Sequence, residues 1–108
     1  MPRVPDLLNQ VSAPFGGGVA GCQEELCGVL AGATISVGAL KGRVRCGQSD
    51  EPAYGIVAEF RDAFGARYGT TQCRPIRDAQ AKQPDGCRPI VEEGTRMLLR
   101  ILERPEGA

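Results

Sequence analysis

The feature that most restricts the fold is an uncharged, mainly apolar stretch of 13 residues from Gly28 to Leu40. Its residues are apolar on nearly every face of a helix, which is typical of a central, buried helix. Gly28, Gly32 and Ser36 recur every four residues and would form a flat ridge that another helix can approach closely. A helix that crosses a bilayer needs about 20 apolar residues, so we expect no membrane insertion.

Helical periodicity and capping signals account for most of the remaining chain. We expect helices over residues 4–12, about 22–40, from the cap candidates Ser49 and Asp50 to a C-cap at Gly69, and over about 88–103. The polar segment 78–86 is predicted to be a loop, and no alternating strand pattern occurs. The sequence therefore predicts an all-α fold, a small bundle of about four helices in a single domain over residues 1–108.

The charge balance excludes one large class of function. Lys and Arg number 13, Asp and Glu number 13, and histidine is absent. Proteins that bind DNA or RNA draw much of their affinity from an excess of Lys and Arg against phosphates, so we expect no nucleic-acid partner. The first residues, Met1–Asp6, lack the apolar stretch of a signal peptide, and we expect a cytoplasmic protein.

The five cysteines are the residues that carry chemistry. Cys22 and Cys27 flank the start of the long apolar helix, Cys73 follows the end of the next helix, and Cys87 opens the last one. If these helices alternate in direction, the four thiols gather at one end of the bundle, while Cys46 lies in the loop at the other. Clustered thiols in a cytoplasmic domain indicate a redox device or a metal site.

Two of these cysteines share a local pattern, Cys-Arg-Pro-Ile, at Cys73 and Cys87. Because proline suits the first turn of a helix, the repeat places both thiols near helix amino termini. A thiolate is stabilised by a helix amino terminus and by a neighbouring cation, and Cys87, beside Arg88, fits this description best. Cys27 is expected more than one turn inside its helix, so it would act as a partner more readily than as the attacking thiol.

Metal binding is the main chemical alternative. Four thiolates from Cys22, Cys27, Cys73 and Cys87 could hold zinc or an iron–sulfur cluster, although their spacing lacks the two-residue knuckle of zinc ribbons. A third interpretation is a helical interaction module in which the cysteines are incidental.

Five parts of the chain form an ordered set of motifs: Phe15–Gly18, Cys27–Gly32, Phe60–Phe64, Arg67–Arg74 and the last cysteine, Cys87. Together they resemble the C_GCAxxG_C_C family of redox-active proteins. The resemblance implies an all-helical fold, a redox role, and an association with a membrane transporter system.

The chain departs from the family pattern in two places. Val29 stands where the motif has alanine, and no cysteine precedes Cys22, whereas the family's first cysteine lies on an N-terminal helix. Either that helix is missing, or Cys22 has replaced the cysteine at the same end of the bundle, which is our hypothesis. An incomplete domain would leave an apolar groove beside the central helix, and a second copy filling it would make a homodimer.

The leading interpretation is a thiol redox protein with an unknown redox partner. In it Cys73 and Cys87 form a reversible disulfide, and Cys27 with Cys22 serves as the resolving or second pair.

Overall fold

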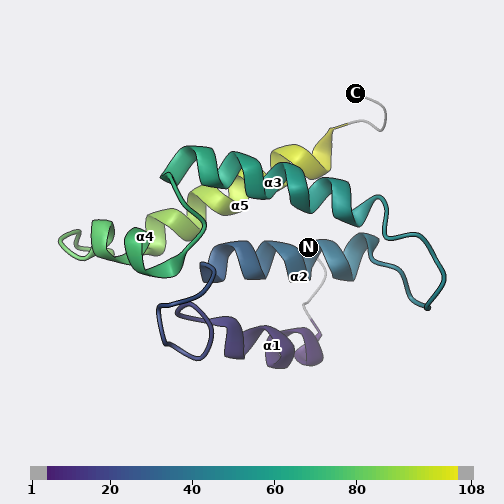
Figure 1. Cartoon of the computed structure of the whole chain (residues 1–108), viewed down its shortest axis with the longest axis horizontal. Helices are drawn as coiled ribbons and strands as arrows, with labels where there is room; N and C mark the ends of the chain where they lie inside the picture. The colour runs from purple at the N-terminus through teal and green to yellow at the C-terminus, as the bar shows by residue number, and fades with distance from the viewer. Residues whose placement is uncertain (1–4, 105–108) are drawn as a thin grey trace.

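The computed structural model describes residues 5–104, and this part of the chain is built from helices (Figure 1). Their order is α1 (Asp6–Ser12), the single 3-10 turn η1 (Ala13–Phe15), α2 (Gly28–Lys41), α3 (Ala53–Tyr68), α4 (Cys73–Gln80) and α5 (Arg88–Glu103). Within residues 5–104 the pairing of extended backbone is limited to one antiparallel bridge between Leu26 and Gln72. The all-α class is confirmed, but the expected count of four helices was one too low.

The core lies where α2, α3 and α5 pack against one another. Phe60, Phe64 and Val37 are almost completely buried, and the two phenylalanine rings stack with their centroids 5.7 Å apart. The other buried members of this cluster are Cys27, Leu30, Ala33, Ile76, Ile90 and Leu98. Figure 1 shows that α2 and α5 begin, and α3 ends, at the same end of the molecule.

The two helices with the strongest capping signals are both present, and their carboxyl ends lie where the sequence predicts them. Helix α3 ends at Gly69, whose φ of 79° is the left-handed geometry that glycine adopts without a Cβ penalty. Its start differs from the prediction, because the N-cap is Pro52 and not Ser49 or Asp50, and the first helical residue is Ala53. Helix α5 runs from Arg88 to Glu103, as expected. Local signals therefore suffice for the carboxyl ends of these two elements.

The start of α2 differs from the prediction. The helix begins at Gly28, six residues after the expected start at Cys22. The preceding segment makes tight turns instead, with positive φ at Gly17, Gly18 and Gly21. Its last residues then pair with the segment before α4, so their backbone hydrogen bonds are made outside any helix.

Helix α4 is the fifth helix that the expected count omits, although the Cys-Arg-Pro-Ile repeat indicated a helix amino terminus near Cys73. It has 8 residues and buries only Cys73 and Ile76. The helix also continues to Gln80, into the polar segment from Asp78 that was predicted to be a loop.

The first helix is shorter than the expected 4–12, since α1 covers Asp6–Ser12, and Val4 lies outside the described residues. Helix α1 contains no buried residue. It lies along α2, on the side away from α3 (Figure 1).

Helix α2 is less buried than its composition predicts. Leu30, Ala31, Ala33 and Val37 are buried, but much of the other side is exposed, namely Thr34, Ser36, Gly38, Ala39 and Leu40. The expectation of a central, buried helix is confirmed for its position, since α2 contacts α1, α3 and α5, and is wrong for this exposed side. Among residues 5–104, no helix has both the length and the apolar character that crossing a membrane requires.

Candidate functional site

Three cysteines stand at the amino termini of three different helices. Cys27 is the N-cap of α2, Cys73 is the first residue of α4, and Cys87 is the N-cap of α5. This corrects one expectation, because Cys27 does not lie inside its helix, and it agrees with the repeat, which places Cys73 and Cys87 near helix amino termini. Each thiol is attached where unpaired backbone N–H groups and the helix dipole favour negative charge.

The antiparallel bridge holds Cys27 and Cys73 in a fixed relation. The backbone N–H of Cys27 donates to the Thr71 carbonyl at 2.7 Å, and the N–H of Cys73 donates to the Glu25 carbonyl at 2.8 Å. These two bonds flank the Leu26–Gln72 pair, so both cysteines are on the same face of the bridge and diagonal to each other. Diagonal neighbours in a ladder are about 7–8 Å apart.

Cys27 and Cys73 are both buried, with 8% and 7% of their surface exposed. Part of the cover over Cys73 is Gly18. A Cβ atom placed on Gly18 would lie 2.7 Å from the Cβ of Cys73 and 3.1 Å from its Sγ. Because Gly18 also has a φ of 76°, glycine suits this position for two independent reasons.

Cys87 is more accessible than the other two, since it is only half-buried. It lines an open hollow of about 380 Å³ together with Arg77, Gln80, Ala81 and Gly86. Arg77 forms no ion pair with any other residue in the 5–104 range, so a free guanidinium stands in the same hollow as the thiol.

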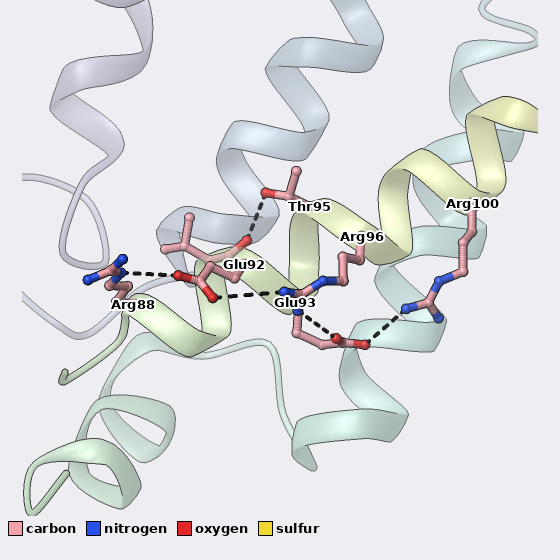
Figure 2. Close-up of polar contacts among 7 residues, drawn as sticks. Arg88, Glu92, Glu93, Thr95, Arg96 and Arg100 are labelled. Carbon is pink, nitrogen blue, oxygen red and sulfur yellow. Dashed lines mark hydrogen bonds and ion pairs between the residues drawn. The ribbon is translucent and has the colours of Figure 1, made fainter. Parts of the chain in front are cut away.

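The arginines within the two Cys-Arg-Pro-Ile repeats form ion pairs with glutamates rather than with the cysteines. Arg88 Nε donates to Glu92 Oε1 at 3.0 Å (Figure 2), and Arg74 Nε donates to Glu24 Oε1 at 3.1 Å. Each charge is therefore balanced by a carboxylate. The expected role of Arg88 as the cation that stabilises the Cys87 thiolate is weakened by this pairing.

The electrostatic surroundings of Cys27 show which thiols lie together. Burial raises the pKa of the Cys27 thiol above its ordinary value of 9.0, and the backbone N–H groups of Val29 and Leu30 offset part of this effect. The thiols of Cys73 and Cys87 raise the pKa further. The thiols of Cys27, Cys73 and Cys87 are thus close enough to influence one another electrostatically.

Cys22 lies beside this group rather than within it. It is exposed in the loop before α2, where its Sγ donates to the Gly18 carbonyl at 3.0 Å and accepts from the Glu24 N–H at 3.3 Å. Gly18 therefore lies between the thiols of Cys22 and Cys73, because it contacts both residues. Cys46 is exposed in the loop between α2 and α3, which is at the other end of the bundle (Figure 1).

The four cysteines do not form a metal site in this geometry. No group of three or more Cys, Asp or Glu side chains from residues 5–104 is arranged so that it could hold a metal ion. The zinc and iron–sulfur alternatives would therefore need Cys22, Cys27, Cys73 and Cys87 to rearrange.

Sequence reasoning missed the parts that hold the site together. The bridge between Leu26 and Gln72 joins segments far apart in the chain, and neither has a strand pattern. The role of Gly18 was equally hidden, although the run Gly16–Gly18 marks a turn.

These observations define a small, all-helical protein with thiols at converging helix termini. In a comparison with protein-family models, residues 2–101 match the family C_GCAxxG_C_C, described as "Putative redox-active protein". The chain belongs to this family. The matched range contains all five cysteines and also α1, which has none. No curated protein and no solved structure matched the chain in the other two comparisons.

Proposed function

We propose that this protein performs thiol–disulfide exchange with the thiols of Cys27, Cys73 and Cys87, and that Cys22 is an auxiliary thiol. The observation that carries the proposal is that the three cysteines stand at the amino termini of three helices, which begin at the same end of the bundle (Figure 1). Membership of a family described as redox-active supports the same class of function.

Cys87 is the attacking thiol in this proposal. It is the most accessible of the three, and the hollow in front of it contains the unpaired Arg77. A guanidinium favours both the thiolate and a negatively charged disulfide substrate. Small anionic disulfides, or a disulfide beside a carboxylate on a partner protein, therefore suit the hollow.

The reaction proceeds by two exchanges. The Cys87 thiolate attacks one sulfur of the substrate disulfide, the substrate S–S bond breaks, and the leaving thiolate takes a proton from solvent. Cys73, after losing its proton, attacks the Cys87 sulfur and releases the second substrate thiol. Two electrons have then passed to the substrate, and the protein holds a Cys73–Cys87 disulfide that a thiol reductant returns to the dithiol.

The two buried thiols differ from Cys87 in role. A diagonal separation of about 7–8 Å across the bridge is too long for a disulfide between Cys27 and Cys73 without backbone movement. Cys87 is attached to the loop that follows α4 and is not held by the bridge, which favours it as the partner of Cys73. Cys27, with its raised pKa, is the reserve thiol that resolves a mixed disulfide when Cys73 is unavailable.

All five cysteines are free thiols. Free thiols persist in the reducing cytoplasm, and we propose that compartment as the site of action. The redox partner is proposed to be a protein disulfide or its reductant. The association with a membrane transporter system, which the family resemblance implies, remains a prediction about that partner.

The test is an exchange assay with oxidised glutathione, a small anionic disulfide. The reduced protein should lose two thiols per chain, and Arg77→Gln should slow the first step without changing the final count. If wild-type protein loses no thiols, or loses only Cys46 and Cys22, the three-thiol assignment is wrong. Zinc or iron found at one equivalent per chain after anaerobic purification would favour the metal alternative instead.

A further inference from the structure

A groove between α2 and α5 presents apolar surface that the single chain does not cover. It has a volume of about 400 Å³. Its lining contains no charged residue and consists of Gly28, Val29, Gly32, Ala33, Ser36, Leu40, Val91, Gly94, Thr95, Leu98, Leu99 and Leu102. Leu40, Val91 and Leu99 are 65%, 51% and 43% exposed. A helix that is apolar all round, as α2 is, normally has cover on every side.

The two hydroxyl groups in the groove need no partner. Ser36 Oγ donates to the Gly32 carbonyl and Thr95 Oγ1 donates to the Val91 carbonyl, both at 2.8 Å. The second of these bonds is drawn in Figure 2. Neither hydroxyl would lose a hydrogen bond if the groove became dry, so burial of these groups carries little desolvation cost. The occupant that fits is therefore an apolar surface rather than a polar ligand.

The same chain carries such a surface on α1 and η1. Leu7, Val11 and Phe15 recur every four residues, so they follow one side of this segment, and they are 65%, 46% and 38% exposed. Helix α1 has 7 residues and buries none of them. A helix this short is not stable in water by itself, and its contacts with α2 leave Leu7 and Val11 exposed, so this apolar side is available to a further partner.

The charge of this chain permits a second copy as the occupant. The groove is lined by uncharged residues, and three arginines and two glutamates of α5 pair with one another, Arg88 and Arg96 with Glu92, and Arg96 and Arg100 with Glu93 (Figure 2). The chain as a whole has zero net charge, so two copies approach without net repulsion. The groove has no charged lining residue that could pair with a strongly charged partner.

We propose that this groove is the interface of a homodimer, in which the Leu7–Phe15 side of one protomer packs into the α2–α5 groove of its partner. In a two-fold arrangement each copy gives one such surface and receives one. The two surfaces also meet within each chain, because a Cβ on Gly28, in the groove, would lie 3.7 Å from the Phe15 carbonyl oxygen. A stable interface needs about 800 Å² from each partner, roughly a tenth of the chain's 7493 Å² accessible surface.

The test is the solution mass, measured by analytical ultracentrifugation over a range of concentrations. Wild-type protein should sediment at twice its chain mass of 11.4 kDa. Leu99→Arg in the groove and Val11→Arg on α1 should each weaken the dimer by about 100-fold or more, because each would bury an unpaired charge. The matched control is Tyr54→Arg on α3, which replaces an exposed apolar residue outside the groove.

Circular dichroism of each variant must show unchanged helix content for these masses to count. A wild-type protein at 11.4 kDa up to the highest concentration would overturn the proposal. A dimer that resists Leu99→Arg would overturn the groove as the interface, and one that resists Val11→Arg would overturn the role of α1. These outcomes are independent of the thiol chemistry, since neither substitution touches a cysteine.

Discussion

The two ends of this bundle hold the same functional group in opposite surroundings. At one end, Cys27, Cys73 and Cys87 stand at the amino termini of three helices and interact with one another. At the other end, Cys46 is exposed in the loop between α2 and α3. A thiol acquires a defined chemistry from its helix terminus, its burial and its neighbours. A comparison of the cysteines at the two ends therefore measures how much the fold contributes to thiol reactivity.

The largest expected effect separates Cys87 from Cys46. Cys87→Ser should abolish the reversible loss of two thiols per chain in the oxidised glutathione assay, because the attacking sulfur is gone. Cys46→Ser should leave that reversible loss unchanged. Thiol titration with a chromogenic disulfide checks both variants, and equal behaviour of the two would remove the distinction between the ends.

The next effect concerns stability in the two redox states. A Cys73–Cys87 disulfide closes a loop of about 15 residues and should raise the free energy of unfolding by about 3 kcal/mol if it is unstrained. Urea unfolding of the oxidised and reduced protein measures the difference. Both redox states are compared in a Cys46→Ser variant, because this variant cannot form a disulfide through Cys46. An oxidised form no more stable than the reduced form would contradict this pairing.

A smaller effect tests the cover over Cys73. In Gly18→Ala the new Cβ would lie 2.7 Å from the Cys73 Cβ, whereas in Gly21→Ala it would have no atom within 4 Å. Both glycines have positive φ, 76° and 72°, so the backbone strain is common to both variants. Gly18→Ala should therefore cost about 2 kcal/mol more than Gly21→Ala, as is typical of overpacking. Equal unfolding free energies would show that the loop does not pack on Cys73.

The smallest effect is the pH dependence that comes from Cys27. Burial raises the pKa of this thiol above 9.0, so at alkaline pH the unfolded chain loses this proton before the folded chain does. The resulting stabilisation is fully present below the unfolded pKa and is lost as the pH rises through the folded pKa.

Cys27→Ala should therefore flatten the decline in stability above about pH 9. The Tyr68 hydroxyl, whose pKa is also raised by burial, contributes to the same decline, so the comparison is made in a Tyr68→Phe background. A decline of equal slope with and without Cys27 would contradict the assignment.

The helices that could be predicted from the sequence are those whose ends are determined locally. Helix α5 has its periodic apolar side and its Arg-Pro start within one segment, and α3 has its terminating glycine. Helix α2 could not be placed correctly at its start, because the backbone of residues 25–27 bonds to residues 71–73. Such long-range hydrogen bonds leave no periodic trace in either segment.

The candidate site likewise has features that local sequence predicts and features that depend on long-range contacts. The repeated Cys-Arg-Pro-Ile pattern correctly indicated that Cys73 and Cys87 lie near helix amino termini. The role expected of Arg88 did not follow, since Arg88 pairs with Glu92, and Arg74, beside Cys73, likewise pairs with a glutamate. Charge pairing depends on which side chains meet in the fold, and Glu24 lies 50 residues from Arg74. The identity of the unpaired cation, Arg77, became visible only in the structure.

The most direct test of the thiol account is the mapping of the disulfide that forms in solution. The reduced protein would be oxidised in a glutathione redox buffer, alkylated and digested, and the linked peptides identified by mass spectrometry. The account predicts one intramolecular disulfide that joins Cys87 to Cys73, with Cys46 alkylated in full. A protein that remains fully reduced throughout, or one linked mainly through Cys46, would contradict it.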